Sequence, residues 1–118
     1  MVEAHAPPAL VHRTADFRGV TGPLLRDGSA LSGLLLSAAG AAGLSTTESP
    51  IVRRLARDGL AVILLLDLGH VVAHTLPSRE LILFDLLVPG DRDPQKAVDV
   101  FTRKLSTAES RSGRLDRG

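Results

Sequence analysis

The sequence feature that most constrains the fold is a long apolar stretch in the second half of the chain. Residues 59–75 (GLAVILLLDLGHVVAHT) are rich in Val, Ile and Leu, and their apolar positions do not follow the 3.6-residue period of a surface helix. The stretch therefore predicts one long or bent β-strand. Residues 76–79 supply a turn, and residues 80–88 (ELILFDLLV) return as the antiparallel partner strand.

Two helices and two further strands are expected around this hairpin. Small and apolar residues recur at helical spacing over residues 27–43, and the Asp-Pro pair at 93–94 is typical of the start of a second helix that continues to residue 105. Segments 12–20 and 44–52 can each add an edge strand. The expected fold class is α+β: a two-layer α/β sandwich with a mainly antiparallel sheet and two helices on one face.

The chain is long enough for one small domain and no more. At 118 residues it can bury roughly two thirds of its unfolded surface, which gives a modest core. Residues 1–11 are rich in Ala and Pro, and residues 106–118 are polar and charged, so both segments are expected to be flexible. The folded domain is expected to comprise residues 12–105.

The composition excludes several classes of function. The 14 basic and 13 acidic residues give a net charge of +1, without the dense basic stripe that nucleic-acid binding needs. No cysteine is present, which excludes disulfides, thiolate metal sites and thiol catalysis. The N-terminus lacks a signal-peptide pattern, and the longest apolar run, residues 60–66, is far shorter than the ~20 residues that cross a bilayer. We expect a cytoplasmic protein with no membrane or nucleic-acid partner.

Both strands of the hairpin are apolar on both faces, which is typical of a sheet that is covered on both sides. Two helices from one chain can cover only one side. The second side is then either an apolar face of a monomer or the contact with another copy, and an exposed apolar face of this size is unusual for soluble monomers. The pattern therefore favours a homodimer, or a heteromer with a homologous chain.

Short motifs at fixed spacing run through this region. In order, the chain carries Gly59-Leu60, Gly69-His70, His74-Thr75-Leu76-Pro77, Phe84-Asp85, Val88-Pro89-Gly90 and Asp93-Pro94. Their order and spacing resemble the short prokaryotic form of the pyruvoyl-dependent S-adenosylmethionine decarboxylase family, whose motifs are Glu-Ser-His, His-Thr-Trp-Pro-Glu, Val-Asp, Thr-Cys-Gly and Asp-Pro. The resemblance covers about residues 12–105 and implies that family's fold and a link to the biosynthesis of polyamines such as spermidine.

The same resemblance implies that the family's chemistry is lost here. In the family the chain cuts itself before the serine of Glu-Ser-His, and the serine becomes a pyruvoyl group whose carbonyl acts as the electron sink for decarboxylation. The serine position is Gly69 in this chain, so no pyruvoyl cofactor is expected. The proton-donating cysteine corresponds to Pro89, the glutamate before the serine to Leu68, and the glutamate after Trp-Pro to Ser78.

His70, His74 and Asp16 remain as candidate site residues. The two histidines are four apart on a strand and so share one face, but without a third ligand we expect no metal site. The resemblance implies a part for His74 in self-cleavage; without the serine, we expect His74 to make a buried hydrogen bond that holds the hairpin. Asp16 can face the positive group of a ligand or be merely solvated. Asp67, on an apolar strand, would need an arginine partner from residues 53–57.

Three classes of function remain open at this point. The first is a catalytically inactive homologue that forms a dimer, or pairs with an active decarboxylase and regulates it. The second is a sensor of S-adenosylmethionine or a related small molecule, although three phenylalanines and no tyrosine or tryptophan leave few surfaces on which adenine could stack. The third is an atypical decarboxylase, which would need an unseen cofactor or altered processing.

Overall fold

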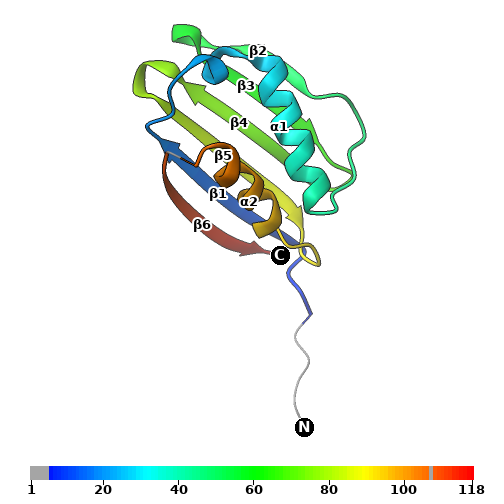
Figure 1. Cartoon of the computed structure of the whole chain (residues 1–118). Helices are drawn as coiled ribbons and strands as arrows, with labels where there is room; N and C mark the ends of the chain where they lie inside the picture. Colours follow the sequence, from blue (N-terminus) through cyan, green and yellow to red (C-terminus); the bar gives the residue numbers. More distant parts are fainter. Residues whose placement is uncertain (1–5, 107) are drawn as a thin grey trace.

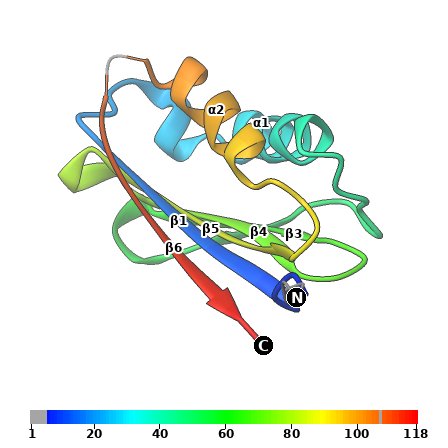
Figure 2. The same ribbon diagram turned by 90° about the horizontal axis from the view of Figure 1, so that it is seen from below.

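The computed structural model describes residues 6–106 and 108–118, and within these ranges the chain forms one six-stranded antiparallel sheet with two α-helices on one face (Figure 1, Figure 2). The order of the strands is β2-β3-β4-β5-β1-β6. The elements are β1 (Leu10–Arg18), η1 (Pro23–Arg26), α1 (Gly28–Ala41), β2 (Ile51–Arg54), η2 (Ala56–Asp58), β3 (Leu60–Leu65), β4 (His70–Leu76), η3 (Pro77–Arg79), β5 (Leu81–Pro89), α2 (Gln95–Lys104) and β6 (Glu109–Arg117). The expected two-layer α+β fold is confirmed. The helices in the described ranges are too short or too polar to cross a bilayer.

The apolar stretch that predicts one long strand forms two strands. β3 ends at Leu65, the chain reverses, and β4 begins at His70 and pairs antiparallel with β3. The reversal depends on Gly69, whose φ of +100° lies in the left-handed region, and on a 3.1 Å hydrogen bond from the Leu66 N–H to the Gly69 carbonyl. Because leucines occupy two of the turn positions, apolar content alone does not reveal the turn.

β1 is an interior strand rather than the predicted edge strand. It pairs with β5 on one side and with β6 on the other. Residues 10–11 belong to β1, so the sheet begins before the expected domain boundary at residue 12. Residues 1–5 of the predicted flexible N-terminal segment lie outside the described residues. The second predicted edge segment contributes β2, which does lie at an edge of the sheet.

The C-terminal residues form β6, which corrects the expectation of a flexible tail over residues 106–118. β6 pairs with β1 along its whole length, from Leu10 opposite Arg117 to Arg18 opposite Glu109. All nine of its residues are exposed. Backbone hydrogen bonds to β1 therefore hold this strand, and burial of its side chains contributes little. Such a strand carries no apolar alternation from which it could be predicted.

The hydrophobic core lies between the two helices and one face of the sheet. Three buried phenylalanines meet at its centre: the ring of Phe84 stacks on Phe101 of α2 with centroids 3.8 Å apart, and Phe17 meets Phe84 edge-on at 5.7 Å. Thr75 is also buried here, and its hydroxyl donates to the Leu25 carbonyl at 2.8 Å. The core thus joins β1, β4 and β5 to both helices.

Both helices begin where the sequence predicts. The Asp27 carboxylate accepts a 3.0 Å hydrogen bond from the Ala30 N–H at the start of α1. The Asp93 carboxylate accepts a 3.0 Å hydrogen bond from the Gln95 N–H at the start of α2. Each bond satisfies one of the free N–H groups in the first turn of a helix.

The other face of the sheet is not covered by any part of the chain that the structure describes (Figure 2). Side chains along β5 alternate strictly, with residues buried toward the helices and half-buried on this opposite side. We call this side the uncovered face. Its apolar side chains include Leu10, Ile63, Val72, Leu83, Leu87 and Leu115.

Candidate functional site

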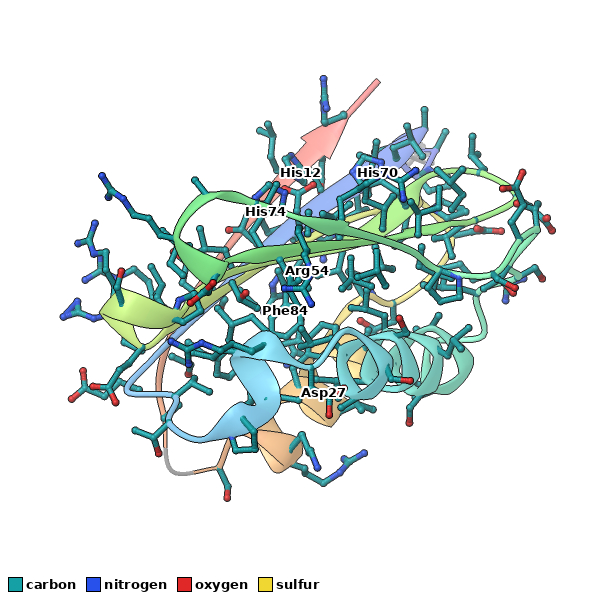
Figure 3. All side chains as sticks on the ribbon, turned by 90° about the horizontal axis from the view of Figure 1, so that it is seen from above. His12, Asp27, Arg54, His70, His74 and Phe84 are labelled. Carbon is teal, nitrogen blue, oxygen red and sulfur yellow. The ribbon has the colours of Figure 1, made fainter. Side chains whose placement is uncertain are left out.

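A carboxylate and two imidazoles meet in the middle of the uncovered face. His12 of β1, Asp85 of β5 and His70 of β4 come from three neighbouring strands. The Nε2 atom of His12 lies 2.5 Å from Oδ1 of Asp85, and the Nε2 atom of His70 lies 3.1 Å from Oδ2 of Asp85. Figure 3 shows both histidines on the side of the sheet away from the helices. We name these three residues the His–Asp–His cluster.

The register of the sheet brings the cluster together. Leu87 of β5 lies opposite both His12 and His70, so the two imidazoles flank this residue. Asp85 is two residues away from Leu87 on the same face of β5, and such diagonal neighbours, about 7–8 Å apart, are within reach of long side chains. Each of the three residues has a buried neighbour next to it on its own strand, Val11, Val71 or Phe84, which fixes its direction away from the core.

Opposing effects act on the Asp85 carboxyl group. Its partial burial raises its pKa, whereas the hydrogen bonds from His12 and His70 and the positive charge of the imidazoles lower it. The lowering effects win, so the pKa of Asp85 lies below its ordinary value of 3.8. Asp85 is therefore ionised at neutral pH and can accept a hydrogen bond on each of its oxygens.

A shallow hollow of about 390 Å³ lies beside the cluster on the uncovered face. It is lined by Thr14, Asp16, Val72, His74, Leu83, Phe84 and Asp85. His74 is exposed, so the expectation that it makes a buried hydrogen bond is wrong. Asp16 is half-buried, and Arg111 of β6 lies directly opposite it in the register. The two predicted candidates, Asp16 and His74, thus lie at one hollow, and His70 lies in the cluster next to it.

The chemistry available to this face is proton exchange and hydrogen bonding. Each imidazole has two ring nitrogens, so the cluster can pass hydrogen bonds from the Asp85 carboxylate to a group bound on this face. Within residues 6–106 and 108–118, no three or more His, Cys, Asp and Glu side chains are arranged to hold a metal ion.

The sequence alone points to His70 but not to its meeting with His12 and Asp85. Asp85 interrupts an apolar strand and belongs to the Phe84-Asp85 motif, whereas His12 lies in a mixed polar and apolar segment and has no local signal that sets it apart. Their contact depends on β1 and β5 being neighbours with one particular register, and that pairing joins residues far apart in the chain. A sequence pattern within either strand does not contain this information.

Comparisons with known proteins identify the family of this chain. The family model described as S-adenosylmethionine decarboxylase matches residues 11–118. This chain belongs to the S-adenosylmethionine decarboxylase family. It is similar to the S-adenosylmethionine decarboxylase proenzyme of Brevibacillus brevis, with 32% identity over 108 residues that make up 91% of this chain and 80% of that protein. The crystal structure of the adenosylmethionine decarboxylase from Aquifex aeolicus has the same fold: the TM-score is 0.82 at 23% identity, covering 96% of this chain and 93% of that one.

The family expected from the motifs is therefore confirmed. Two of the four positions at which the resemblance implies a departure from the motifs of S-adenosylmethionine decarboxylases lie near one another. Gly69 immediately precedes β4, and Pro89 ends β5. A Cβ atom added to Gly69 would lie 3.5 Å from the Cα atom of Val88 and would overlap the carbonyl group of Leu87. With a φ of +100° as well, Gly69 has neither the space nor the backbone conformation for a side chain.

A second hollow, of about 500 Å³, opens at this end of the sheet. Its lining includes Leu68, Pro89, Asp67, Asp91 and Arg92. Asp67 lies in the turn between β3 and β4, is exposed, and donates its backbone N–H to the Ser45 carbonyl at 2.9 Å. The expected buried Asp67 with an arginine partner is therefore wrong, since the arginines of residues 53–57 are exposed too.

Proposed function

We propose that this chain is a catalytically inactive member of the family that acts as a dimeric interaction or regulatory homologue linked to polyamine biosynthesis. The proposal rests on one observation, the residue type and the backbone conformation at position 69, which is Gly69. A pyruvoyl group forms from a serine through attack of its hydroxyl on the preceding carbonyl, and glycine has no hydroxyl. The residues present therefore do not fit this cofactor.

The surroundings of Gly69 support the same conclusion. The turn brings the Leu87 carbonyl into the space that a Cβ atom would occupy, so it is built around a glycine. Pro89, at the cysteine position, has no thiol that could donate a proton to a carbanion. The serine hydroxyl and the cysteine thiol of the family motifs are thus both absent, at positions that lie near one another in the fold. We expect this of a homologue that keeps the fold and no longer catalyses the reaction.

The uncovered face supports the dimer. Six strands spaced about 4.8 Å apart and about seven residues long at ~3.3 Å per residue give a face of roughly 700 Å² on each copy. Standard protein interfaces bury roughly 800 Å² on each partner. Two such faces can therefore stack as two aligned sheets, about 10 Å apart, with the helices on the outside. The same surface would serve a heteromer with an active homologue, because a related chain would present a similar sheet.

Native mass spectrometry combined with a decarboxylation assay tests the proposal. We expect an uncleaved chain of 118 residues at twice its monomer mass, with release of carbon dioxide from S-adenosylmethionine no faster than without protein. Two fragments, or carbon dioxide release above that background, would overturn the inactive assignment. A monomer that also leaves the activity of a purified decarboxylase from the same cell unchanged would overturn the interaction role.

The hollow of about 500 Å³ favours one second candidate, a sensor of S-adenosylmethionine or a related metabolite. Leu68 and Pro89, which replace the family's glutamate and cysteine, both line it. Calorimetry with S-adenosylmethionine tests this role, and Leu68→Trp, which would place a larger side chain at the hollow, is the matched control. Heat with the wild type that disappears in L68W would support the sensor; no heat at millimolar ligand would end it.

A further inference from the structure

A third hollow lies between two turns at the end of the sheet away from Gly69. The turn from β2 to β3 and the turn from β4 to β5 lie side by side there, and both views of the fold show this (Figure 1, Figure 2). The hollow has a volume of about 440 Å³. Arg57 lines it from the first turn, and Ser78 and Arg79 line it from the second. Two arginines from separate parts of the chain thus line one concave surface.

Neither arginine has an acidic partner in the part of the chain that the structure describes, where the ion pairs involve other residues. Two acids belong to the same turns. An oxygen of Asp58 lies 4.0 Å from Nε of Arg26, and the exposed Glu80 follows Arg79 in the chain. Neither of these carboxylates lines the hollow. The two guanidinium groups therefore present positive charge that a bound anion can neutralise.

The backbone at Arg57 is unusual for an arginine. Its φ is +58° and that of Asp58 is +61°, so both central residues of the turn lie in the left-handed region. The Gly59 N–H donates to the Ala56 carbonyl at 3.1 Å, and the Leu55 N–H donates to the Gly59 carbonyl at 2.8 Å, which closes the turn. Glycine and asparagine adopt this conformation at lower cost. An arginine held against the local backbone preference is typical of a position that has a function.

The groups that line the hollow are suited to a phosphate group. A guanidinium donates in a planar fork that matches the oxygens of phosphate and carboxylate. Arg57 and Arg79 together carry two positive charges, whereas a phosphate monoester carries about −1.5 to −2 near pH 7 and a monocarboxylate only one negative charge. The Ser78 hydroxyl adds a donor. The Thr75 hydroxyl, also at the hollow, already donates to the Leu25 carbonyl at 2.8 Å.

We propose that this hollow binds a small metabolite through a phosphate monoester group, with Arg57 and Arg79 contacting the phosphate oxygens. Leu55 and Leu76, which also line the hollow, contact the rest of the ligand. The chain has no tyrosine or tryptophan and its three phenylalanines are buried, so no aromatic ring is placed to stack on a nucleobase. The ligand is therefore a phosphate ester without a base. This inference goes beyond the proposed function and needs neither the dimer nor the inactive assignment.

Titrations followed by two-dimensional proton–nitrogen NMR spectra at constant ionic strength test the inference. The probes are inorganic phosphate and glycerol 3-phosphate, and acetate is the carboxylate control. We expect saturable shifts of the backbone amides of Arg57, Ser78 and Arg79 with both phosphate probes at millimolar concentration. Acetate should bind at least ~3-fold more weakly, because it carries one negative charge in place of nearly two.

The test variant carries Arg57→Gln and Arg79→Gln together, because glutamine keeps a hydrogen-bond donor and removes the charge. The matched control carries Arg103→Gln and Lys104→Gln, which remove the same charge from exposed positions of α2 that do not line the hollow. We expect phosphate to bind at least ~10-fold more weakly to R57Q/R79Q and less than ~2-fold more weakly to R103Q/K104Q. Circular dichroism checks that both variants are folded.

Wild-type shifts that do not saturate, or binding that weakens equally in both double variants, overturn the inference, because they indicate general attraction of anions to a basic surface. Shifts with inorganic phosphate but not with glycerol 3-phosphate overturn the ester ligand. Equal affinity for acetate overturns the preference for a dianion. The proposed function is judged by the mass of the assembly and by carbon dioxide release, so it can stand when this inference fails.

Discussion

Gly69, which the motif resemblance matches to the family's serine, has a φ of +100°, in a region that residues with a side chain rarely adopt. The nearby carbonyl of Leu87 fills the space on the side where a Cβ atom would project. At the scale of single residues, this position therefore lacks a hydroxyl and also lacks the space and the backbone conformation for a side chain. Adding a hydroxyl alone does not change that geometry.

The variant Gly69→Ser tests that statement directly. We expect the chain to remain uncleaved. Its unfolding free energy should fall by about 1–3 kcal/mol, because the serine must adopt a strained conformation or displace Leu87. Urea unfolding and gel electrophoresis measure the two outcomes. Gly33→Ser is the matched control: Gly33 lies in α1 with open space around it, so its change should stay within about 0.5 kcal/mol. A cleaved or fully stable G69S chain would contradict the prediction.

Asp85 gives a second residue-scale prediction, in pH dependence. Partial burial raises its pKa, but the hydrogen bonds from His12 and His70 and the charges of these imidazoles together outweigh burial, so the pKa is lowered in the folded chain. A lowered pKa means that the carboxylate stabilises the fold above its ordinary pKa of 3.8, and that this contribution is lost as the pH falls through the folded value. Asp85→Asn should therefore be less stable than the wild type near pH 7, and the gap should close as the pH falls below 3.8 and through the folded pKa. Unfolding free energies of both chains across this range measure it; a gap of constant size would refute it.

At the scale of elements, the sequence predicts those segments whose side chains are buried with a regular period. α1, α2 and the returning strand β5 all alternate between the core and the outside, and an aspartate carboxylate accepts a backbone N–H at the start of each helix. β6 cannot be predicted from the sequence pattern because none of its side chains is buried. The reversal between β3 and β4 cannot be predicted either, because the leucines of the turn continue the apolar run and only Gly69 marks the turn.

β6 yields the prediction that belongs to this scale. Ending the chain after Ser106 removes β6 and leaves β1 with a row of unpaired backbone groups at the edge of the sheet. We expect lower stability and self-association beyond a dimer, because an unprotected edge strand pairs readily with other chains. Thermal unfolding and light scattering measure both effects. The full-length variant Ser110→Ala, an exposed change within β6, is the control and should behave as the wild type.

At the scale of the whole molecule, one side of the sheet is covered by helices and the other is not (Figure 2). This asymmetry follows from the sequence, since strands that are apolar on both faces exceed what two helices can cover. The His–Asp–His cluster at the centre of the uncovered face does not follow from it. Three strands must first pair in the observed register before His12, Asp85 and His70 can meet, and tertiary pairing of this kind cannot be inferred from patterns within each strand.

A charge placed in the middle of that face tests the dimer. Leu83→Arg puts a guanidinium at a half-buried position of β5, opposite Asp16 of β1, where the proposed partner copy would have to desolvate the charge and make room for the longer side chain. We expect dimer affinity to fall at least ~10-fold while the chain stays folded, measured by sedimentation and circular dichroism. Leu36→Arg is the matched control, because Leu36 lies on α1 with 43% of its surface exposed and outside the uncovered face. Equal weakening by both changes would point to a general loss of structure instead of an interface.

The turn at Gly69 also makes a serine at this position difficult to acquire by evolution. A lineage that gained a serine here by a single substitution would first meet the Leu87 carbonyl and a left-handed backbone, and so would lose stability before it gained a hydroxyl placed for chemistry. The turn and the end of β5 would have to be rebuilt beforehand, by changes that bring no benefit of their own. Selection acting on such a chain can refine its surface far more readily than it can place a serine at this turn.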